Sequence, residues 1–289
     1  MENRLISSDF LKRLERLSLN IEKLMNAGGG GARKSRAKGS SVEFSDFREY
    51  SSGDDIKRID WNAYGRLNRL FIKLFMEERE AFINIFLDCS KSMEFDNKAN
   101  LSMELTAALS YLSLINMDRL CLNLMEGKNL RVSEVYGGRG QFNRSASFIN
   151  KVEFVYETDL ITAIKNKRFP GRGLAIIISD FFTDGDFEEI LKFLTYNKQE
   201  IVLLHILSLY ERQPDFGGSI RLKDSETGEE INVELSTSIL DRYEKALNSF
   251  ITDINEKCKK YGGLYANVTS NEKMEKVLFE DLIKSRIIK

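Results

Sequence analysis

Five oxygen-bearing side chains in the central part of the chain have the types and spacing of a divalent-cation site. Asp88, Ser90 and Ser92 lie within the short sequence DCSKS, and Thr158 and Asp180 follow much later in the chain. Hydroxyl and carboxylate oxygens are the ligands that magnesium and manganese prefer in proteins. The sequence therefore predicts that these five residues form a site for Mg2+ or Mn2+.

The segments that precede these residues predict that they meet at one edge of a sheet. Residues 81–87 (AFINIFL) and 174–179 (LAIIIS) are short apolar runs typical of buried strands, and they end at Asp88 and Asp180. Thr158 begins a predicted helix, TDLITAI. In an open α/β sheet, ligands bind outside the carboxyl ends of the strands, so residues far apart in sequence come together there.

The mixture of hydroxyls and acids indicates a binding role for the predicted site. We expect Ser90, Ser92 and Thr158 to contact the ion directly, while Asp88 and Asp180 act partly through water. The ion would then keep much of its positive charge and attract an acidic residue of a partner protein. A cage made only of carboxylates would instead neutralise the ion.

Two alternatives stay open for these residues. The sequence DCSKS also fits a strand-to-helix turn, in which a serine caps the next helix and the aspartate accepts hydrogen bonds from local amides. In the second segment, Asp159 or Thr162 could take the place of Thr158 as the ligand.

The composition indicates an ordinary globular protein whose partner is not selected by bulk charge. The 43 basic and 44 acidic residues nearly cancel, so nucleic-acid binding is not expected beyond a local patch. The sequence has no apolar stretch of membrane-spanning length and no secretory signal, which predicts a cytoplasmic protein. Cys89, Cys121 and Cys258 form no CxxC pair, so we expect reduced thiols and no structural zinc site.

Periodicity and composition divide the chain into five segments, one of which is an α/β core. We expect this core to be a mostly parallel sheet with helices on both faces. The segments are an N-terminal amphipathic helix with a Gly-rich linker (1–31), a basic loop and β-rich segment (32–79), the core (80–210), a β-hairpin insertion (211–236), and a helix-strand-helix that completes the core (237–289). Whether segments 32–79 and 211–236 form one small β-rich subdomain stays open.

The N-terminal segment carries a stripe of apolar residues at helical spacing. The stripe predicts a helix of about twenty residues that docks on its own chain, with a partner helix as the alternative. Its members are Phe10, Leu14, Leu17, Ile21 and Leu24, and Gly28 to Gly31 follow.

The next segment begins with four basic residues and no acidic one, namely Arg33, Lys34, Arg36 and Lys38. No aromatic residues interleave with these charges, which favours a solvated loop over a contact with phosphate or nucleic acid. The chain contains no Walker A sequence, so nothing indicates that it hydrolyses ATP itself.

The block REYSSGDDIKRIDWNAYGR mixes arginines and aspartates around the only tryptophan of the chain. It predicts a structural corner held by ion pairs. A partner-docking surface is the alternative, because Arg and Trp dominate interface hot spots. The residues concerned are Arg48, Asp54, Asp55, Arg58 and Trp61.

An enzyme is the less favoured class. A phosphatase of the haloacid-dehalogenase type would use Asp88 as its nucleophile, but it needs a second acid where this chain has Ser90. A Cys89 nucleophile would need a base, and the only histidine, His205, lies within the apolar run EIVLLHIL and is expected in the core. We expect no enzymatic activity and keep a metal-dependent phosphohydrolase using Asp88 as the alternative.

The five candidate ligands resemble the metal-ion-dependent adhesion site of von Willebrand factor A domains, Asp-x-Ser-x-Ser followed by a distant Thr and Asp. Together with VEFSDFREYSSGDDIKRIDWNAYGR, MEEREAFINIFLDCSKSM, ISDFF and LKDSETGEE, they resemble a bacterial family called domain of unknown function 58. The resemblance covers residues 39–266. The chain departs from the plainest pattern with Cys89 after the first Asp and with Glu157, rather than Gly, before Thr158.

The resemblance implies a Rossmann-like von Willebrand factor A fold with a divalent cation at the carboxyl edge of its sheet. It also implies a functional pairing with a MoxR-type AAA+ ATPase, in which the protein acts as an adaptor that helps to assemble or activate other protein complexes. A client protein would then be the source of the acidic residue that reaches the metal.

Overall fold

The computed structural model describes residues 7–21, 44–75, 81–214, 218–223, 228 and 230–289. The chain divides into two compact units. One unit combines Met1–Ile21 with Ala81–Lys289, and the other is Glu22–Glu80. The candidate metal ligands all belong to the first unit.

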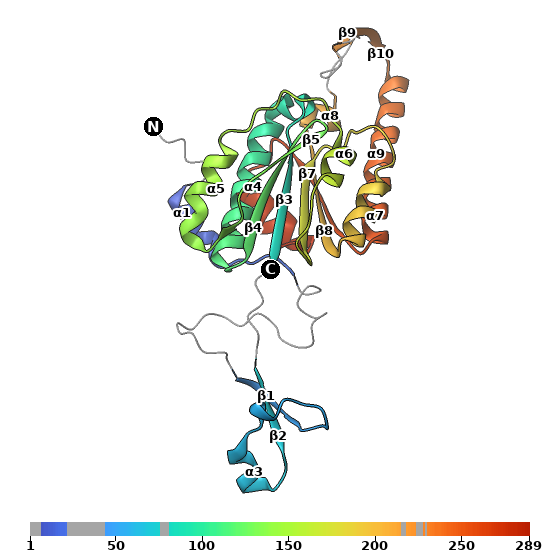
Figure 1. Cartoon of the computed structure of the whole chain (residues 1–289). Helices are drawn as coiled ribbons and strands as arrows, with labels where there is room; N and C mark the ends of the chain where they lie inside the picture. The colour runs from blue at the N-terminus through green and yellow to red at the C-terminus, as the bar shows by residue number, and fades with distance from the viewer. Residues whose placement is uncertain (1–6, 22–43, 76–80, 215–217, 224–227, 229) are drawn as a thin grey trace. The chain divides into compact units, whose positions relative to one another are not determined.

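A seven-stranded sheet forms the centre of the first unit (Figure 1). Its strand order is β5-β4-β3-β7-β8-β11, and β6 also pairs with β4. Five strands are parallel, whereas β5 and β6 run antiparallel to β4. The bounds are β3 Phe82–Asp88, β4 Arg119–Glu126, β5 Asn129–Val132, β6 Tyr136–Gly137, β7 Gly173–Ser179, β8 Gln199–Leu207 and β11 Leu264–Thr269.

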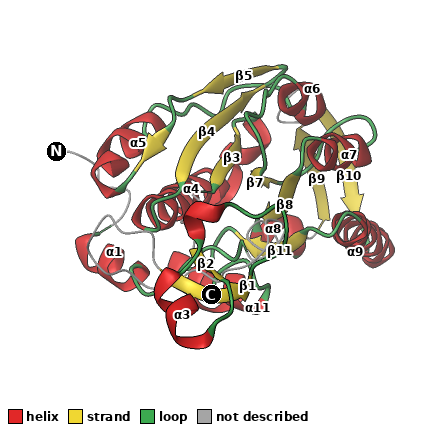
Figure 2. Cartoon of the chain, turned by 60° about the horizontal axis from the view of Figure 1, so that its bottom comes forward, coloured by secondary structure: helices red, strands yellow, loops and turns green. Residues whose placement is uncertain are grey.

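Helices cover both faces of this sheet, as Figure 2 shows from below. On one face, α4 (Lys98–Ile115) lies against the central strands and contacts α1 (Ser8–Leu14) and α5 (Phe142–Ile149). On the other face, α6 (Leu160–Lys165), α7 (Glu188–Tyr196) and α9 (Thr237–Lys260) pack side by side. Because both faces are covered, the central strands are continuous apolar runs rather than alternating ones. The expected Rossmann-like α/β fold is confirmed.

Helix α4 shows why a sequence with many hydroxyl groups can be buried on nearly all sides. Ser102, Thr106, Ser110 and Ser113 are all completely buried. Each hydroxyl donates a hydrogen bond to a backbone carbonyl three or four residues earlier in the helix. The small side chains therefore allow close packing against the sheet without leaving an unpaired hydroxyl group.

Short elements follow the last core strands. Helix α8 (Leu209–Arg212) comes directly after β8, at the carboxyl end of the sheet. After β11, the chain ends with α10 (Met274–Lys276), a π-helical turn (Val277–Asp281) and α11 (Leu282–Lys284). Leu278 and Leu282 are buried here, as expected for a helix that returns to the core, whereas Ile283 is 39% exposed.

The prediction of an N-terminal helix of about twenty residues is wrong in length, because α1 has seven residues and ends at Leu14. The next residues pair with the C-terminal end of the chain. The amides of Ser18 and Asn20 donate to the carbonyls of Lys289 and Ile287, and Leu19 forms an antiparallel bridge with Ile288. These tertiary hydrogen bonds replace helical ones, which the apolar stripe could not foretell.

The stripe nevertheless packs against its own chain, as predicted. Phe10, Leu14 and Ile21 are buried, and Leu17 is half-buried. The ring of Phe10 meets that of Phe279 edge-on at 5.8 Å. Leu24, the glycines at 28–31 and the basic residues Arg33 to Lys38 lie outside the described residues.

The two β-rich segments form separate two-stranded sheets. One consists of β1 (Phe44–Glu49) and β2 (Phe71–Phe75), and the other of β9 (Gly218–Lys223) and β10 (Glu230–Leu235). Both are antiparallel, and they belong to different compact units. Among the described residues, no strand pairing joins the two segments.

Candidate metal centre

Asp88 and Asp180 come together because their strands are neighbours. Strands β3 and β7 pair in parallel, with Leu87 opposite Ile178, so both acids lie at the carboxyl edge of the sheet. The Ser179 hydroxyl donates a 2.6 Å hydrogen bond to Asp88 Oδ2 and thereby joins the two strand ends. From β3, the chain continues to β4 on one side, whereas β7 lies on the other side. This is the kind of topological switch point at which ligands bind in open α/β sheets.

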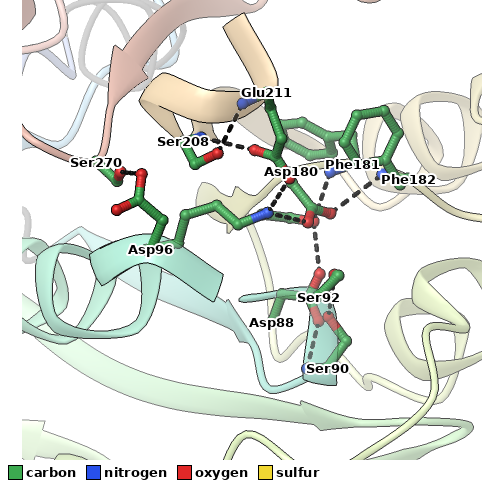
Figure 3. A network of polar contacts seen from close by, with 12 residues as sticks. Asp88, Ser90, Ser92, Asp96, Asp180, Phe181, Phe182, Ser208, Glu211 and Ser270 are labelled. Atoms are coloured by element: carbon green, nitrogen blue, oxygen red, sulfur yellow. Dashed lines mark hydrogen bonds and ion pairs between the residues drawn. The ribbon is translucent and has the colours of Figure 1, made fainter. Parts of the chain in front are cut away.

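The turn DCSKS folds the two serines back toward Asp88 (Figure 3). The Ser90 amide donates to Asp88 Oδ1 at 3.0 Å, and the hydroxyl oxygens of Ser90 and Ser92 lie 3.0 Å apart. Ser90 occupies the N-cap position of a 3-10 segment (Lys91–Asn97), but its side chain makes no capping hydrogen bond. One part of the turn alternative is therefore observed, because Asp88 accepts a hydrogen bond from a local amide. The other part is not observed at Ser90, because its hydroxyl does not cap the segment that follows.

The segment before Thr158 runs beside this turn. Ser90 forms a parallel bridge with Tyr156, and the Lys91 amide donates to the Tyr156 carbonyl at 2.9 Å. Thr158 follows two residues later and is half-buried. The structure thus places the Thr158 segment at the same edge of the sheet as DCSKS.

Thr158 does not begin helix α6, which starts at Leu160. Asp159 is the N-cap, because its carboxylate accepts from the Thr162 amide at 3.0 Å and so satisfies a free donor of the first turn. That use of Asp159 makes it a poor substitute ligand. Thr162 lies inside the helix and is exposed. Among the three alternatives, Thr158 stays the predicted ligand.

Asp180 lies in a buried ion-pair network that the sequence analysis missed. Its Oδ1 accepts from the Phe182 amide at 3.2 Å, and its Oδ2 accepts from Lys98 Nζ at 2.9 Å. Lys98 Nζ also contacts Glu211 Oε1 at 2.6 Å. Both Lys98 and Asp180 are completely buried. No sequence signal marks Lys98, because lysines are almost always exposed and this one begins an ordinary helix.

Glu211 is fixed by helix α8. It forms a capping box in which its Oε2 accepts from the Ser208 amide at 2.6 Å, while its own amide donates to the Ser208 hydroxyl at 2.9 Å. Figure 3 shows Glu211 and Ser208 next to Asp180. The network therefore connects the ends of β7 and β8 with the first residue of α4.

Burial and mutual repulsion determine the electrostatics of the two strand-end acids. Burial, together with the nearby Asp180 carboxylate, raises the pKa of Asp88 to about 7. Burial opposes the charged form of Lys98, but the carboxylates of Asp180 and Glu211 outweigh it, so the pKa of Lys98 is raised. When Asp88 is deprotonated, the carboxylates of Asp88, Asp180 and Glu211 carry more negative charge than Lys98 compensates, and a cation at this edge would favour that deprotonated form.

The donor set fits a hard cation that is held largely by hydroxyl groups. Within the described part of the chain, no group of three or more His, Cys, Asp or Glu residues is placed to hold a metal. A zinc-type or all-carboxylate site is therefore not formed there. Oxygen atoms of the five predicted ligands would hold Mg2+ or Mn2+, which would supply a positive centre for an outside carboxylate. Asp88, Ser90, Ser92 and Asp180 do lie together, and their binding of metal stays a prediction.

The block around Trp61 lies in the second unit and is built from local hydrogen bonds. Arg48 pairs with Asp54 at 2.8 Å, and the side chain of Asp54 also accepts from the Ser51 amide. Asp55 caps a short 3-10 helix (Ile56–Arg58). Trp61, the first residue of α3 (Trp61–Leu67), is 61% exposed, so ion pairs do not enclose it. The corner exists as a series of turns and caps, and the predicted docking role of Arg48, Asp54, Asp55, Arg58 and Trp61 stays a prediction.

The side chains considered for catalysis lie in the core. His205 is completely buried, and its Nδ1 lies 2.7 Å from the Tyr265 hydroxyl. Cys89 is also buried, and burial raises the pKa of its thiol. All three cysteines are free. Burial therefore denies the Cys89 thiol the thiolate character that a nucleophile needs.

The sequence of this chain matches a known protein family. The model of a family described as "Protein of unknown function DUF58" matches residues 46–250. An uncharacterized protein of Mycobacterium tuberculosis (strain ATCC 25618 / H37Rv) is 24% identical over 250 residues, which are 83% of this chain and 78% of that protein.

Two solved structures are distant likenesses. The conserved hypothetical protein BatB from Bacteroides thetaiotaomicron has a TM-score of 0.45 and 14% identity, over 71% of this chain and 98% of that one. The SpRpn10 VWA domain has a TM-score of 0.38 and 13% identity, over 70% of this chain and 94% of that domain. No helix among the described residues is long and apolar enough to cross a membrane.

Proposed function

Because the chain belongs to the protein family of unknown function DUF58, we propose that it is a non-enzymatic protein-binding adaptor whose binding depends on Mg2+ or Mn2+. The observation that carries this proposal is the cluster of Asp88, Ser90, Ser92 and Asp180 at the switch point of the sheet. Two carboxylates and several hydroxyl groups leave a bound cation able to accept one more anionic ligand. The acidic side chain of a partner protein is the ligand of suitable chemistry.

Exposed aromatic side chains on the segments that follow the core strands support a protein as the partner. Phe95, after β3, is 49% exposed, Phe182, after β7, is 40% exposed, and Tyr210, after β8, is 46% exposed. The rings of Phe95 and Tyr210 contact each other at 6.3 Å. Aromatic residues beside a charged centre are typical of interface hot spots. A carboxylate on the metal would provide specificity, and these rings would provide apolar contact area.

We further propose that the partner is a MoxR-type AAA+ ATPase, or a client protein that such an ATPase acts upon. This part of the proposal is supported by the sequence resemblance described above. The absence of a Walker A sequence from the chain fits a division of labour in which another protein supplies ATP hydrolysis.

Binding to the purified MoxR-type ATPase of the same organism tests the proposal. We expect association in the presence of magnesium and its loss on chelation, in Asp88→Ala and in the double variant Ser90→Ala with Ser92→Ala. Ser147→Ala, which changes an exposed hydroxyl on α5, is the matched control. If chelation and Asp88→Ala both leave the affinity unchanged, the metal-dependent mechanism is wrong.

The phosphohydrolase alternative has less support from the geometry. Both oxygens of Asp88 already accept hydrogen bonds, from the Ser90 amide and the Ser179 hydroxyl, and Ser90 stands where the general acid would be needed. Incubation with generic phosphoester substrates and magnesium tests this alternative directly. Turnover that disappears in Asp88→Ala would replace the adaptor proposal with a hydrolase.

A further inference from the structure

The buried ammonium group of Lys98 lies beside a predicted metal ligand. Its Nζ contacts Asp180 Oδ2 at 2.9 Å and Glu211 Oε1 at 2.6 Å. The side chain of Lys98 is completely buried, and that of Glu211 is 21% exposed. One of the two carboxylate oxygens of Asp180 thus already forms an ion pair with a side chain of the protein, the Lys98 ammonium group.

A buried lysine is costly unless carboxylates compensate its charge. Here two acids from different elements do so, one at the end of β7 and one in α8. Lys98 is the first residue of α4, a helix packed against the centre of the sheet, so the ammonium has little room to withdraw. Its charge is therefore a constant part of the site.

The charge balance shows what this ammonium does to a bound cation. Asp88 and Asp180 are the only carboxylates among the predicted ligands, and Lys98 already compensates part of the charge on Asp180. A metal at the site would consequently be neutralised mainly by Asp88. Charges interact more strongly in a buried site than in water, so the ammonium also repels the cation directly.

We propose that Lys98 is a built-in counter-cation that keeps the metal weakly bound and positively charged, so that it still needs the carboxylate of a partner. Glu211 weakens this effect, because its carboxylate compensates part of the positive charge that Lys98 would otherwise direct at Asp180. Lys98 acts through Asp180 and is therefore a positioning residue, not a ligand. The inference rests on the proposed metal site and explains how that site would favour binding over metal storage.

Metal affinity tests this inference without any assay of partner binding. Titration of the full chain with Mg2+ by calorimetry, and with Mn2+ by electron paramagnetic resonance, gives the dissociation constants. We expect Lys98→Met to bind both ions about tenfold more tightly or better, because the repulsion disappears. We expect Glu211→Gln to bind them at least about threefold more weakly, because the whole charge of Lys98 then faces Asp180.

Two further variants separate charge from structure. Lys98→Arg keeps the charge and should bind metal within about threefold of the wild-type chain. Lys192→Met, which removes a lysine 57% exposed on α7, should leave the affinity unchanged. If Lys98 serves only to hold the fold together, Lys98→Met would weaken metal binding instead of tightening it. Thermal unfolding with and without metal shows whether each variant is folded. If Lys98→Met does not fold, Glu211→Gln still decides.

The outcomes distinguish this inference from the proposed function. If the wild-type chain binds metal and Lys98→Met binds it equally or more weakly, the counter-cation role is overturned and the metal site stands. Binding that appears only in Lys98→Met would support the counter-cation role and overturn the metal-dependent adaptor. The absence of binding in every variant would overturn both.

Discussion

The single histidine allows a sharp test of how the core controls the pH dependence of stability. His205 is completely buried, with its ring packed among Phe181, Phe250 and Tyr265. Burial, followed by the positive charge of Arg212, lowers the pKa of His205 from 6.5 to about 3. The folded protein therefore keeps this imidazole neutral under conditions in which the unfolded chain protonates it.

The size of the effect follows from proton linkage. Between pH 6.5 and about 3, the unfolded chain binds one proton at His205 that the folded chain does not bind. The stability that results from a neutral His205 is complete above pH 6.5 and is lost as the pH falls, by about 1.4 kcal/mol per pH unit. Acidification by about 1.5 units below that value should therefore cost about 2 kcal/mol.

Asp88 has the opposite sign in the same pH range. Its pKa is raised from 3.8 to about 7 by burial and by Asp180, so in the absence of metal the folded chain binds the additional proton between these values. This contribution makes the protein more stable as the pH falls. The two effects largely cancel in the wild-type chain, and only a comparison with a variant reveals either one.

The assay is urea unfolding in the presence of a chelator, for the wild-type chain and for His205→Phe, between about pH 5 and pH 6.5. We expect the wild-type chain to lose about 2 kcal/mol relative to the variant over this range. Tyr265→Phe is the matched control, because it removes the hydrogen-bond partner of His205 and leaves the ionisable ring. Equal pH slopes for wild type and His205→Phe would refute the reasoning.

Three further substitutions test the packing of the first unit, each by chemical denaturation. Ser179→Ala removes the donor to Asp88 Oδ2 and the acceptor for the Phe181 amide and should cost about 1–3 kcal/mol, whereas a neutral effect would mean that water replaces the hydroxyl. Gly173→Ala would place a Cβ 2.5 Å from the Phe82 carbonyl oxygen; we expect a loss of about 1–3 kcal/mol, and unchanged stability would show that the two strands can separate slightly. Leu14→Ala, at a completely buried side chain of α1, should cost about 2–5 kcal/mol, and a cost below that range would mean that α1 does not dock firmly.

Much of the fold could be predicted from the sequence because its signals are local. The apolar runs that became β3 and β7 are short, rich in β-branched or aromatic residues and end at an acid, and the structure confirms both strands. The hydrogen bond between the Ser90 amide and Asp88 joins residues only two positions apart. The turn at DCSKS could therefore also be predicted from the sequence.

What the sequence could not determine depends on contacts between distant residues. Helix α1 stops at Leu14 because the next segment pairs with residues 287–289, at the other end of the chain. The ion pairs of Lys98 join residues 82 and 113 positions apart, and no periodicity or motif marks such a pair. The sequence by itself determined which oxygen-bearing residues end the strands, since strand formation and turn chemistry act over a few residues. Only the tertiary structure decided that a buried lysine lies among them, because its burial requires two carboxylates from two other elements, the end of β7 and α8.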